Sequence, residues 1–113
     1  MHDTVLTKIY DFWKLILPLA GKFPRQYKFV LGDRIQHLSS DLMERVVEAY
    51  FTSGNIENKR SMIQNANLKV ELLRRYLRLS HDLGILSFST LERLQRQVDE
   101  IGRMLGGWLK SLK

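Results

Sequence analysis

The sequence predicts an all-α fold, an antiparallel up-down-up-down bundle of four helices. Apolar residues recur at spacings of three and four along four segments, as on the buried face of a helix. No segment shows the alternation of apolar and polar residues that is typical of a β-strand. The connections between the segments are only a few residues long, so consecutive helices must run antiparallel. A chain of 113 residues can bury one such core, and we expect residues 1–113 to form a single domain.

The first helix is predicted to begin with Asp3 or Thr4 as its N-cap and to continue to about Leu17. Pro18 and Gly21 are expected to end it, because proline cannot donate the helical hydrogen bond and glycine has a low helix propensity. The face that we expect in the core consists of Val5, Ile9, Phe12, Trp13 and Ile16.

Pro24 suits the first turn of a second helix, because its fixed φ angle matches the helix and the N–H that it lacks would be unpaired there. This helix is predicted to continue without interruption to Phe51, where Ser53-Gly54-Asn55 stops it. Its apolar seam consists of Leu31, Ile35, Leu38, Leu42, Val46 and Ala49.

The third helix is predicted from about Glu57 to Leu83, with Gly84 ending it. It carries two apolar stripes, so we expect it to contact more than one neighbour. The first stripe consists of Ile63, Ala66, Val70, Leu73 and Leu77, and the second of Leu68, Leu72, Tyr76, Leu79 and Leu83.

Ser87 is the predicted N-cap of the fourth helix, which extends from about Phe88 to Leu112. Its seam consists of Leu91, Leu94, Val98, Ile101, Leu105, Trp108 and Leu112. Three glycines interrupt the second half of this helix, although each costs about 1 kcal/mol relative to alanine. We expect another helix to approach them closely, with Trp108 covering the gap; an irregular, frayed end is the alternative. The glycines are Gly102, Gly106 and Gly107.

The composition favours a basic intracellular protein with an anionic partner. The formal net charge is +6 and the pI is near 9.8, which favours nucleic acid over a membrane surface. The chain has no cysteine, as is common in the cytoplasm. The apolar run from Leu15 to Ala20 is broken by Pro18 and is too short to span a bilayer, so we expect a cytoplasmic protein without a membrane segment.

We find no pattern typical of a metal site or of a catalytic site, and we expect neither a cofactor nor enzymatic activity. His2, His37 and His81 lie on different predicted elements, and only His37 has carboxylates four residues away, in Asp33 and Asp41. There is no strand-turn-helix elbow for a nucleophile and no Gly-rich phosphate loop. Most carboxylates have ordinary helical partners instead, including the i, i+4 pairs Asp99/Arg103, Glu71/Arg75 and Asp41/Arg45.

Three groups of basic residues are the candidate nucleic-acid contacts. Closely spaced arginines with few acidic neighbours repel one another unless phosphates bind them. The alternative is a solvated face of exposed ion pairs, each of little energetic weight, in which Glu71, Asp82 and Glu92 neutralise part of the charge. The candidates are Arg74, Arg75 and Arg78 on the third helix, Arg93 and Arg96 on the fourth, and Lys22, Arg25 and Lys28 in the first connection.

Specific segments of the chain resemble a known family, the accessory variability determinant (Avd) of diversity-generating retroelements, which is related to the bacterial four-helix bundles encoded by ribosomal RNA intervening sequences. The resemblance covers nearly the whole chain, and the C-terminal segment is its most specific part. It rests on Phe23-Pro24-Arg25, Leu31-Gly32-Asp33-Arg34-Ile35, Asn67-Leu68-Lys69, Leu72-Leu73-Arg74, Leu77-Arg78-Leu79 and Glu100-Ile101-Gly102-Arg103-Met104-Leu105-Gly106-Gly107-Trp108.

This resemblance implies a homopentameric barrel that partners a reverse transcriptase and template RNA or DNA during mutagenic copying. The surfaces it implies for assembly are the second stripe of the third helix, with Leu72, Tyr76 and Leu79, and the glycine-lined end of the fourth. Two other functions remain open. One is a non-catalytic protein-interaction scaffold like the intervening-sequence bundles. The other is a module on anionic membranes, which the lack of exposed aromatic and leucine anchors disfavours.

Overall fold

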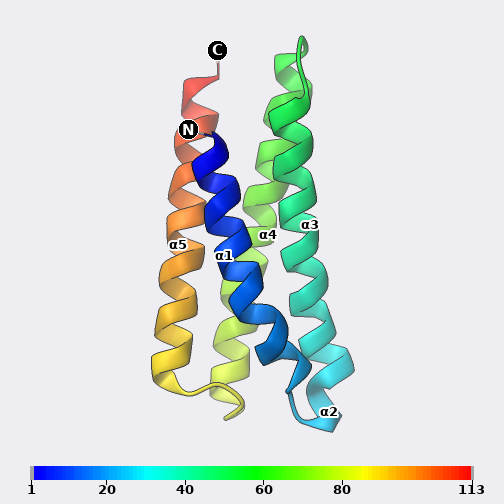
Figure 1. Ribbon diagram of the computed structural model, residues 1–113, viewed down its shortest axis with the longest axis vertical. Coiled ribbons are helices and arrows are strands. Elements are labelled where there is room, and N and C mark those ends of the chain that lie inside the picture. The colour runs from blue at the N-terminus through cyan, green and yellow to red at the C-terminus, as the bar shows by residue number, and fades with distance from the viewer. Residues whose placement is uncertain (1, 113) are drawn as a thin grey trace.

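The computed structural model describes residues 2–112, and it describes side chains for residues 4–112. Four long helices, α1 (His2–Gly21), α3 (Asp33–Phe51), α4 (Ile56–Asp82) and α5 (Phe88–Ser111), form a bundle of 46 × 23 × 19 Å (Figure 1). A short helix α2 (Arg25–Tyr27) and a π-helical turn η1 (Lys28–Gly32) precede α3. No strand occurs within residues 2–112, so the predicted all-α class is confirmed.

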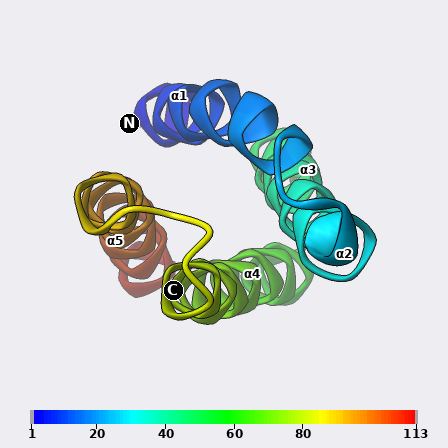
Figure 2. The ribbon, with the colours of Figure 1, turned by 90° about the horizontal axis from the view of Figure 1, so that it is seen from below.

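The four long helices alternate in direction and surround one core. Viewed along the bundle, α1, α3, α4 and α5 follow one another around the axis in chain order (Figure 2). Each short connection therefore joins two antiparallel neighbours, as the sequence predicted. The connection through α2 and η1 and the connection between α4 and α5 lie at the same end of the bundle (Figure 1).

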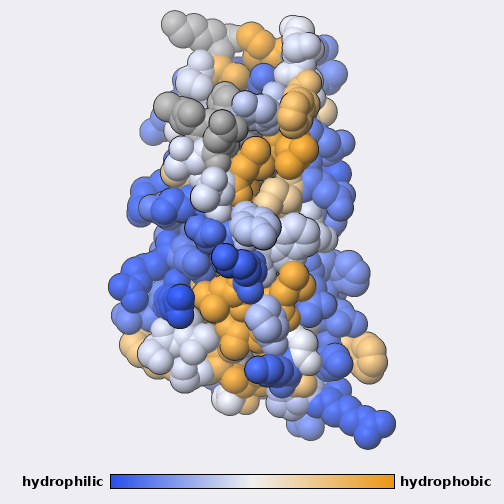
Figure 3. Space-filling view, viewed as in Figure 1, coloured by the Kyte–Doolittle hydropathy of each residue, from blue (hydrophilic) through white to orange (hydrophobic). Residues whose placement is uncertain are grey.

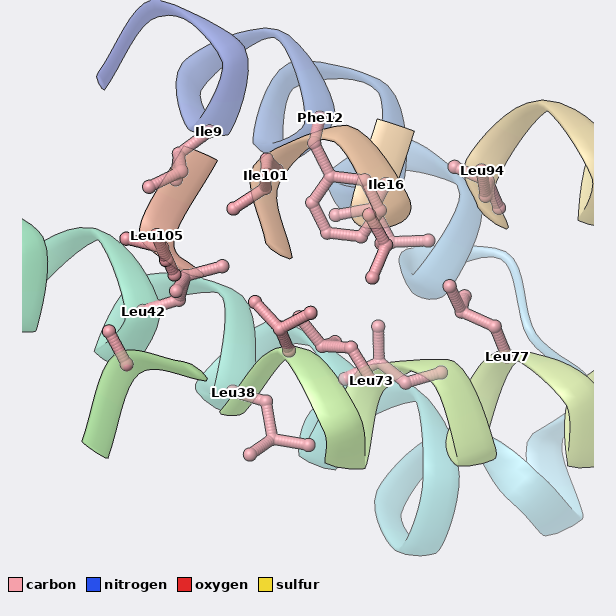
Figure 4. Close-up of a cluster of buried hydrophobic side chains, with 14 of the residues drawn as sticks. Ile9, Phe12, Ile16, Leu38, Leu42, Leu73, Leu77, Leu94, Ile101 and Leu105 are labelled. Atoms are coloured by element: carbon pink, nitrogen blue, oxygen red, sulfur yellow. The ribbon is translucent and has the colours of Figure 1, made fainter. Parts of the chain in front are cut away.

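The predicted seams form this core. Side chains from all four long helices meet along the axis, among them Phe12 of α1, Leu42 of α3, Leu73 of α4 and Leu105 of α5 (Figure 4). Every seam residue predicted for the second and fourth helices and for the first stripe of the third is buried, except Leu112, which is half-buried. Trp13 was predicted to lie in the core, but it is only half-buried and packs at the edge of the core.

The first helix begins earlier and ends later than predicted, although Gly21, one of its two predicted stops, is its last residue. Helix α1 begins at His2, so Thr4 lies inside it, and the side chain of Asp3 is outside the described residues. It also continues through Pro18 to Gly21. Ile16 and Ala20, before and after Pro18, are both buried on the same face. Burial of this continuous face offsets the hydrogen bond that Pro18 cannot donate.

The second helix is not continuous, because the π-helical turn η1 separates α2 from α3. Leu31 and Gly32 of this turn are buried. A Cβ at Gly32 would lie 2.8 Å from the carbonyl oxygen of Ala20, so only glycine lets the turn pack against the end of α1. The sequence contains this glycine, but its periodicity gives no signal for a contact with a residue on another helix.

The predicted boundaries of α4 and α5 and the predicted cap Ser87 are close to those observed, whereas Asn55, predicted only as part of the preceding stop, also caps α4. Asn58 N–H donates to Asn55 Oδ1 at the start of α4, and Thr90 N–H donates to Ser87 Oγ at the start of α5. Gly84 follows α4 with a φ of 80°, the left-handed conformation that glycine adopts most readily. On α4 the first stripe is buried, whereas Leu68, Leu79 and Leu83 of the second are exposed.

Candidate nucleic-acid interface

The net positive charge is concentrated at the end of the bundle that contains α2. This basic end comprises residues 17–34 and 74–96, which meet there because both connections are at the same end (Figure 1). Its acidic residues are Asp33, Asp82 and Glu92. Its basic residues are Lys22, Arg25, Lys28, Arg34, Arg74, Arg75, Arg78, Arg93 and Arg96, which include all eight candidate contacts.

Four of the five candidate arginines on α4 and α5 form ion pairs. Glu71 pairs with both Arg74 and Arg75, the second at 2.9 Å. Arg78 lies 3.4 Å from Asp82, and Arg96 lies 3.7 Å from Glu92. For these four arginines the structure therefore has the ion pairs of the stated alternative, with Glu71, Asp82 and Glu92 as partners. Carboxylates one helical turn away relieve their repulsion, although exposed pairs of this kind contribute little to stability.

Arg74 differs from the other arginines because it connects two helices. Its Nε lies 2.9 Å from Oδ1 of Asp99 on α5, and its backbone carbonyl accepts a hydrogen bond from Gln95 at 3.1 Å. Its side chain is 30% exposed, against 72% for Arg75. Two carboxylates and the neighbouring helix thus hold the guanidinium of Arg74, which leaves it poorly placed to bind a phosphate.

The other four candidates carry cations without a carboxylate partner. Lys22, Arg25 and Lys28 are exposed around α2, and none of them forms an ion pair with any residue of 4–112. Arg93 is also unpaired within that range, but it lines a hollow between α5 and α1 that includes Lys14. The structure therefore separates Arg93 from the arginines of α4 and leaves the group around α2 as the most available cations.

The expected helical ion pairs are confirmed only in part. Glu71 and Arg75 form the predicted pair. Asp99, by contrast, pairs with Arg74 across the helix interface rather than with Arg103. Arg45 pairs with Glu44 and Glu48 rather than with Asp41. Spacing along one helix cannot predict such choices, because partners on the same turn or on the next helix compete for the same charge.

The three glycines of α5 have different environments. A Cβ at Gly102 would lie 2.9 Å from Nη2 of Arg74 and 3.4 Å from Cγ1 of Val70, so α4 does approach closely there. Apart from its chain neighbours and the nearby backbone of α5 itself, a Cβ at Gly106 or at Gly107 would meet no atom of the described chain within 4 Å. The expectation of a close helix is therefore confirmed at Gly102 and is wrong within this chain at the other two. Trp108 is buried on the core face.

An apolar surface lies on α1 at its border with α3. Hydrophobic side chains form an upper and a lower group along the centre of this face, with hydrophilic ones between the groups and on both sides (Figure 3). Tyr10, Trp13 and Leu17 line a shallow hollow, and Nε1 of Trp13 is buried without a partner among the described residues. Together with the exposed leucines of α4, this surface is apolar area that the bundle itself does not cover, so the expectation that the exposed faces lack aromatic and leucine side chains is wrong.

Sequence reasoning missed two features near the basic end. Arg34 lies over the ring of Tyr76 at 5.9 Å and donates to its hydroxyl at 3.4 Å, which fixes part of the second α4 stripe against α3. Phe29 and Val30 of η1 are exposed. In the sequence these two apolar residues directly precede Leu31 and do not fit the three- and four-residue spacing of the seam that begins there. That misfit was the available signal for an irregular turn.

The histidines do not assemble a metal site in the described chain. No group of three or more possible ligands is close enough to hold an ion among residues 4–112. Nδ1 of His81 lies 2.9 Å from the carbonyl oxygen of Leu86, which supports the turn before α5.

None of the helices, over the part of the chain that the structure describes, is both long enough and apolar enough to cross a membrane.

A family model described as bAvd-like matches residues 4–112, nearly the whole chain. No curated protein shows significant similarity to the chain.

Proposed function

Because the chain belongs to the bAvd-like family, as its motifs predicted, we propose that it binds nucleic acid and a reverse transcriptase as a non-catalytic accessory protein of a diversity-generating retroelement. Family membership supports the accessory role in general. The observation that carries the nucleic-acid part is the concentration of unpaired, exposed cations around α2.

Lys22, Arg25 and Lys28 are the primary phosphate contacts in this proposal. Phosphates that bind them release counterions from the nucleic acid, and no carboxylate in residues 4–112 competes for them. Arg75, Arg78 and Arg96 are secondary contacts, with Arg93 at the α1 side of the same end. Their exposed pairs with Glu71, Asp82 and Glu92 are weak enough for phosphates to replace the carboxylates. Arg74 is assigned to holding α4 against α5.

The exposed apolar areas outside the core support the proposal that the chain also binds proteins, namely further copies of itself and a reverse transcriptase. Leu68, Leu79 and Leu83 are exposed along the second α4 stripe, beside the half-buried Leu72 and Tyr76. This stripe and the open surface at Gly106 and Gly107 would form the contacts of a homopentamer. The apolar face of α1 is then available to the reverse transcriptase.

The nucleic-acid proposal is tested by removing charge from one end of the bundle and not from the other. Fluorescence anisotropy with a mixed-sequence single-stranded RNA measures affinity at several salt concentrations. The variant Lys22→Gln, Arg25→Gln, Lys28→Gln is expected to bind more weakly, with a log–log salt slope flatter by about 2, because each lost phosphate contact removes about 0.7. The matched control is Lys59→Gln, Arg103→Gln, Lys110→Gln, which removes equal charge toward the opposite end. Equal effects of the two variants would contradict a defined site.

The polymerase proposal is tested by co-purification with the reverse transcriptase of the same retroelement. The complex is expected to persist after nuclease treatment, since the apolar surfaces do not need RNA. A genome without a reverse-transcriptase gene and paired short repeats beside this gene would contradict the retroelement role. The exposed α4 stripe would then favour a protein-interaction scaffold, the second candidate function.

A further inference from the structure

Phe29 is an exposed aromatic residue that packs against no other ring. It is 73% exposed, and the adjacent Val30 is 67% exposed. The other strongly exposed phenylalanines have ring partners: Phe88 lies edge-on to His81 at 5.9 Å, and Phe51 lies edge-on to Tyr50 at 5.1 Å. Phe29 has no such contact among the residues that the structure describes. Its ring is therefore available to a ligand.

The fold holds Phe29 in this position. It belongs to the π-helical turn η1, whose last two residues, Leu31 and Gly32, are buried. Gly32 lies close to the carbonyl oxygen of Ala20, since the Cβ that glycine lacks would be only 2.8 Å from that atom. The buried end of the turn packs against α1, while the ring at position 29 lies outside the core. Single π-helical turns of this kind are frequent at functional sites.

The charges around Phe29 are positive. Lys28 precedes it, Arg25 is four residues earlier on the short helix that leads into η1, and Lys22 lies in the preceding connection. All three are exposed and lack a carboxylate partner within residues 4–112. The nearest acidic residue in the sequence, Asp33, is half-buried. An anionic partner with flat apolar groups complements this combination, and a neutral protein surface does not.

We propose that Phe29 stacks on an unpaired base of a single-stranded nucleic acid whose phosphates are bound by Lys22, Arg25 and Lys28. This inference rests on the proposed function and names the form of nucleic acid that the site prefers. Aromatic stacking on a base is largely independent of sequence, because every base has a π-face. A duplex cannot supply the contact, since its bases are already stacked on one another.

The test compares Phe29→Ala with Phe51→Ala, an equally exposed phenylalanine at the opposite end of α3. The probes are a short mixed-sequence single-stranded RNA and the corresponding duplex, followed by anisotropy. Phe29→Ala is expected to weaken single-strand binding about tenfold or more, with the salt slope unchanged, because stacking is lost and no phosphate contact is. Phe29→Trp is expected to restore binding. Phe51→Ala, and Phe29→Ala with the duplex, are expected to have little effect.

Each result separates the stacking contact from the general binding. Unchanged single-strand affinity in Phe29→Ala, with binding still lost in the Lys22, Arg25, Lys28 variant, would overturn stacking and leave the proposed function standing. Equal losses for single strand and duplex would also overturn it. A change in oligomer size on light scattering would assign Phe29 to an interface between copies of the chain. If the wild-type chain binds no RNA, the proposed function itself fails.

Discussion

The guanidinium of Arg74 occupies the space that a side chain at Gly102 would need. A Cβ at Gly102 would lie 2.9 Å from Nη2 of Arg74, while Nε of the same guanidinium lies 2.9 Å from Oδ1 of Asp99. Glycine at this position therefore lets an arginine from α4 lie across α5 and reach a carboxylate there. The two residues are expected to be energetically coupled.

This coupling predicts that the effect of Gly102→Ala on the free energy of unfolding depends on whether Arg74 is present. Gly102→Ala is expected to change the free energy of unfolding little in the wild-type chain, because the gain in helix propensity is offset by displacing the guanidinium. In an Arg74→Ala background the nearest atom left is Cγ1 of Val70, at an ordinary contact distance of 3.4 Å, and the same change should stabilise the chain by about 1 kcal/mol. Chemical denaturation of the four chains of the double-mutant cycle measures the difference. Additive effects would show that the two residues are independent.

Gly32→Ala is expected to destabilise the chain by about 1 to 3 kcal/mol, the usual cost of overpacking. The added Cβ would meet the backbone oxygen of Ala20 at 2.8 Å, and a backbone atom held in a helix cannot move aside as a side chain can. Gly21→Ala is the matched control, because its Cβ would lie at an ordinary 4.0 Å from Nε2 of Gln36. Thermal melts of both variants check this prediction, and equal melting temperatures would refute the tight contact.

Gly106 tests for a contact between chains, since nothing in the described chain, apart from its chain neighbours and the nearby backbone of α5 itself, lies within 4 Å of a Cβ at this position. In an isolated protomer, Gly106→Ala should stabilise α5 by about 1 kcal/mol, and Gly106→Leu should also be tolerated. In the proposed pentamer, Gly106→Leu is expected to overpack a neighbouring chain and weaken assembly. Light scattering at micromolar concentration, together with thermal melts, separates the two effects. Higher melting temperatures for both variants with unchanged assembly would place Gly106 outside any interface.

Removing the N-caps of α4 and α5 is expected to lower the free energy of unfolding by similar amounts. Asn55→Ala and Ser87→Ala each remove a side-chain acceptor from a backbone N–H, 3.1 Å away at Asn58 and 3.2 Å away at Thr90. Each is expected to cost about 1 kcal/mol in denaturant-induced unfolding. Ser61→Ala, at an exposed position inside α4, is the control and should be neutral or slightly stabilising. A loss as large at Ser61 would mean that the caps have no special role.

The sequence by itself determined the four long helices, their antiparallel order and the core between them. Periodic apolar residues such as Leu42, Val70 and Leu105 specify which face of each helix is buried, and short connections specify which helices are neighbours. The motifs around Gly32 and Gly102 also predicted the family that the match over residues 4–112 confirms. These signals depend on local spacing, which a single chain displays in full.

The tertiary structure alone decided which residues on different helices compete, compensate or leave space for one another. Only packing keeps α1 helical through Pro18, and only the end of α1 explains the glycine of the π-helical turn. Asp99 is bound by Arg74, 25 residues away, rather than by its helical neighbour Arg103. The candidate site differs from the predicted one for the same reason. Arg74 connects two helices, and the unpaired cations around Phe29 are the centre of the candidate nucleic-acid site. Contacts between helices depend on how the faces meet in space, and periodicity along one helix carries no information about that meeting.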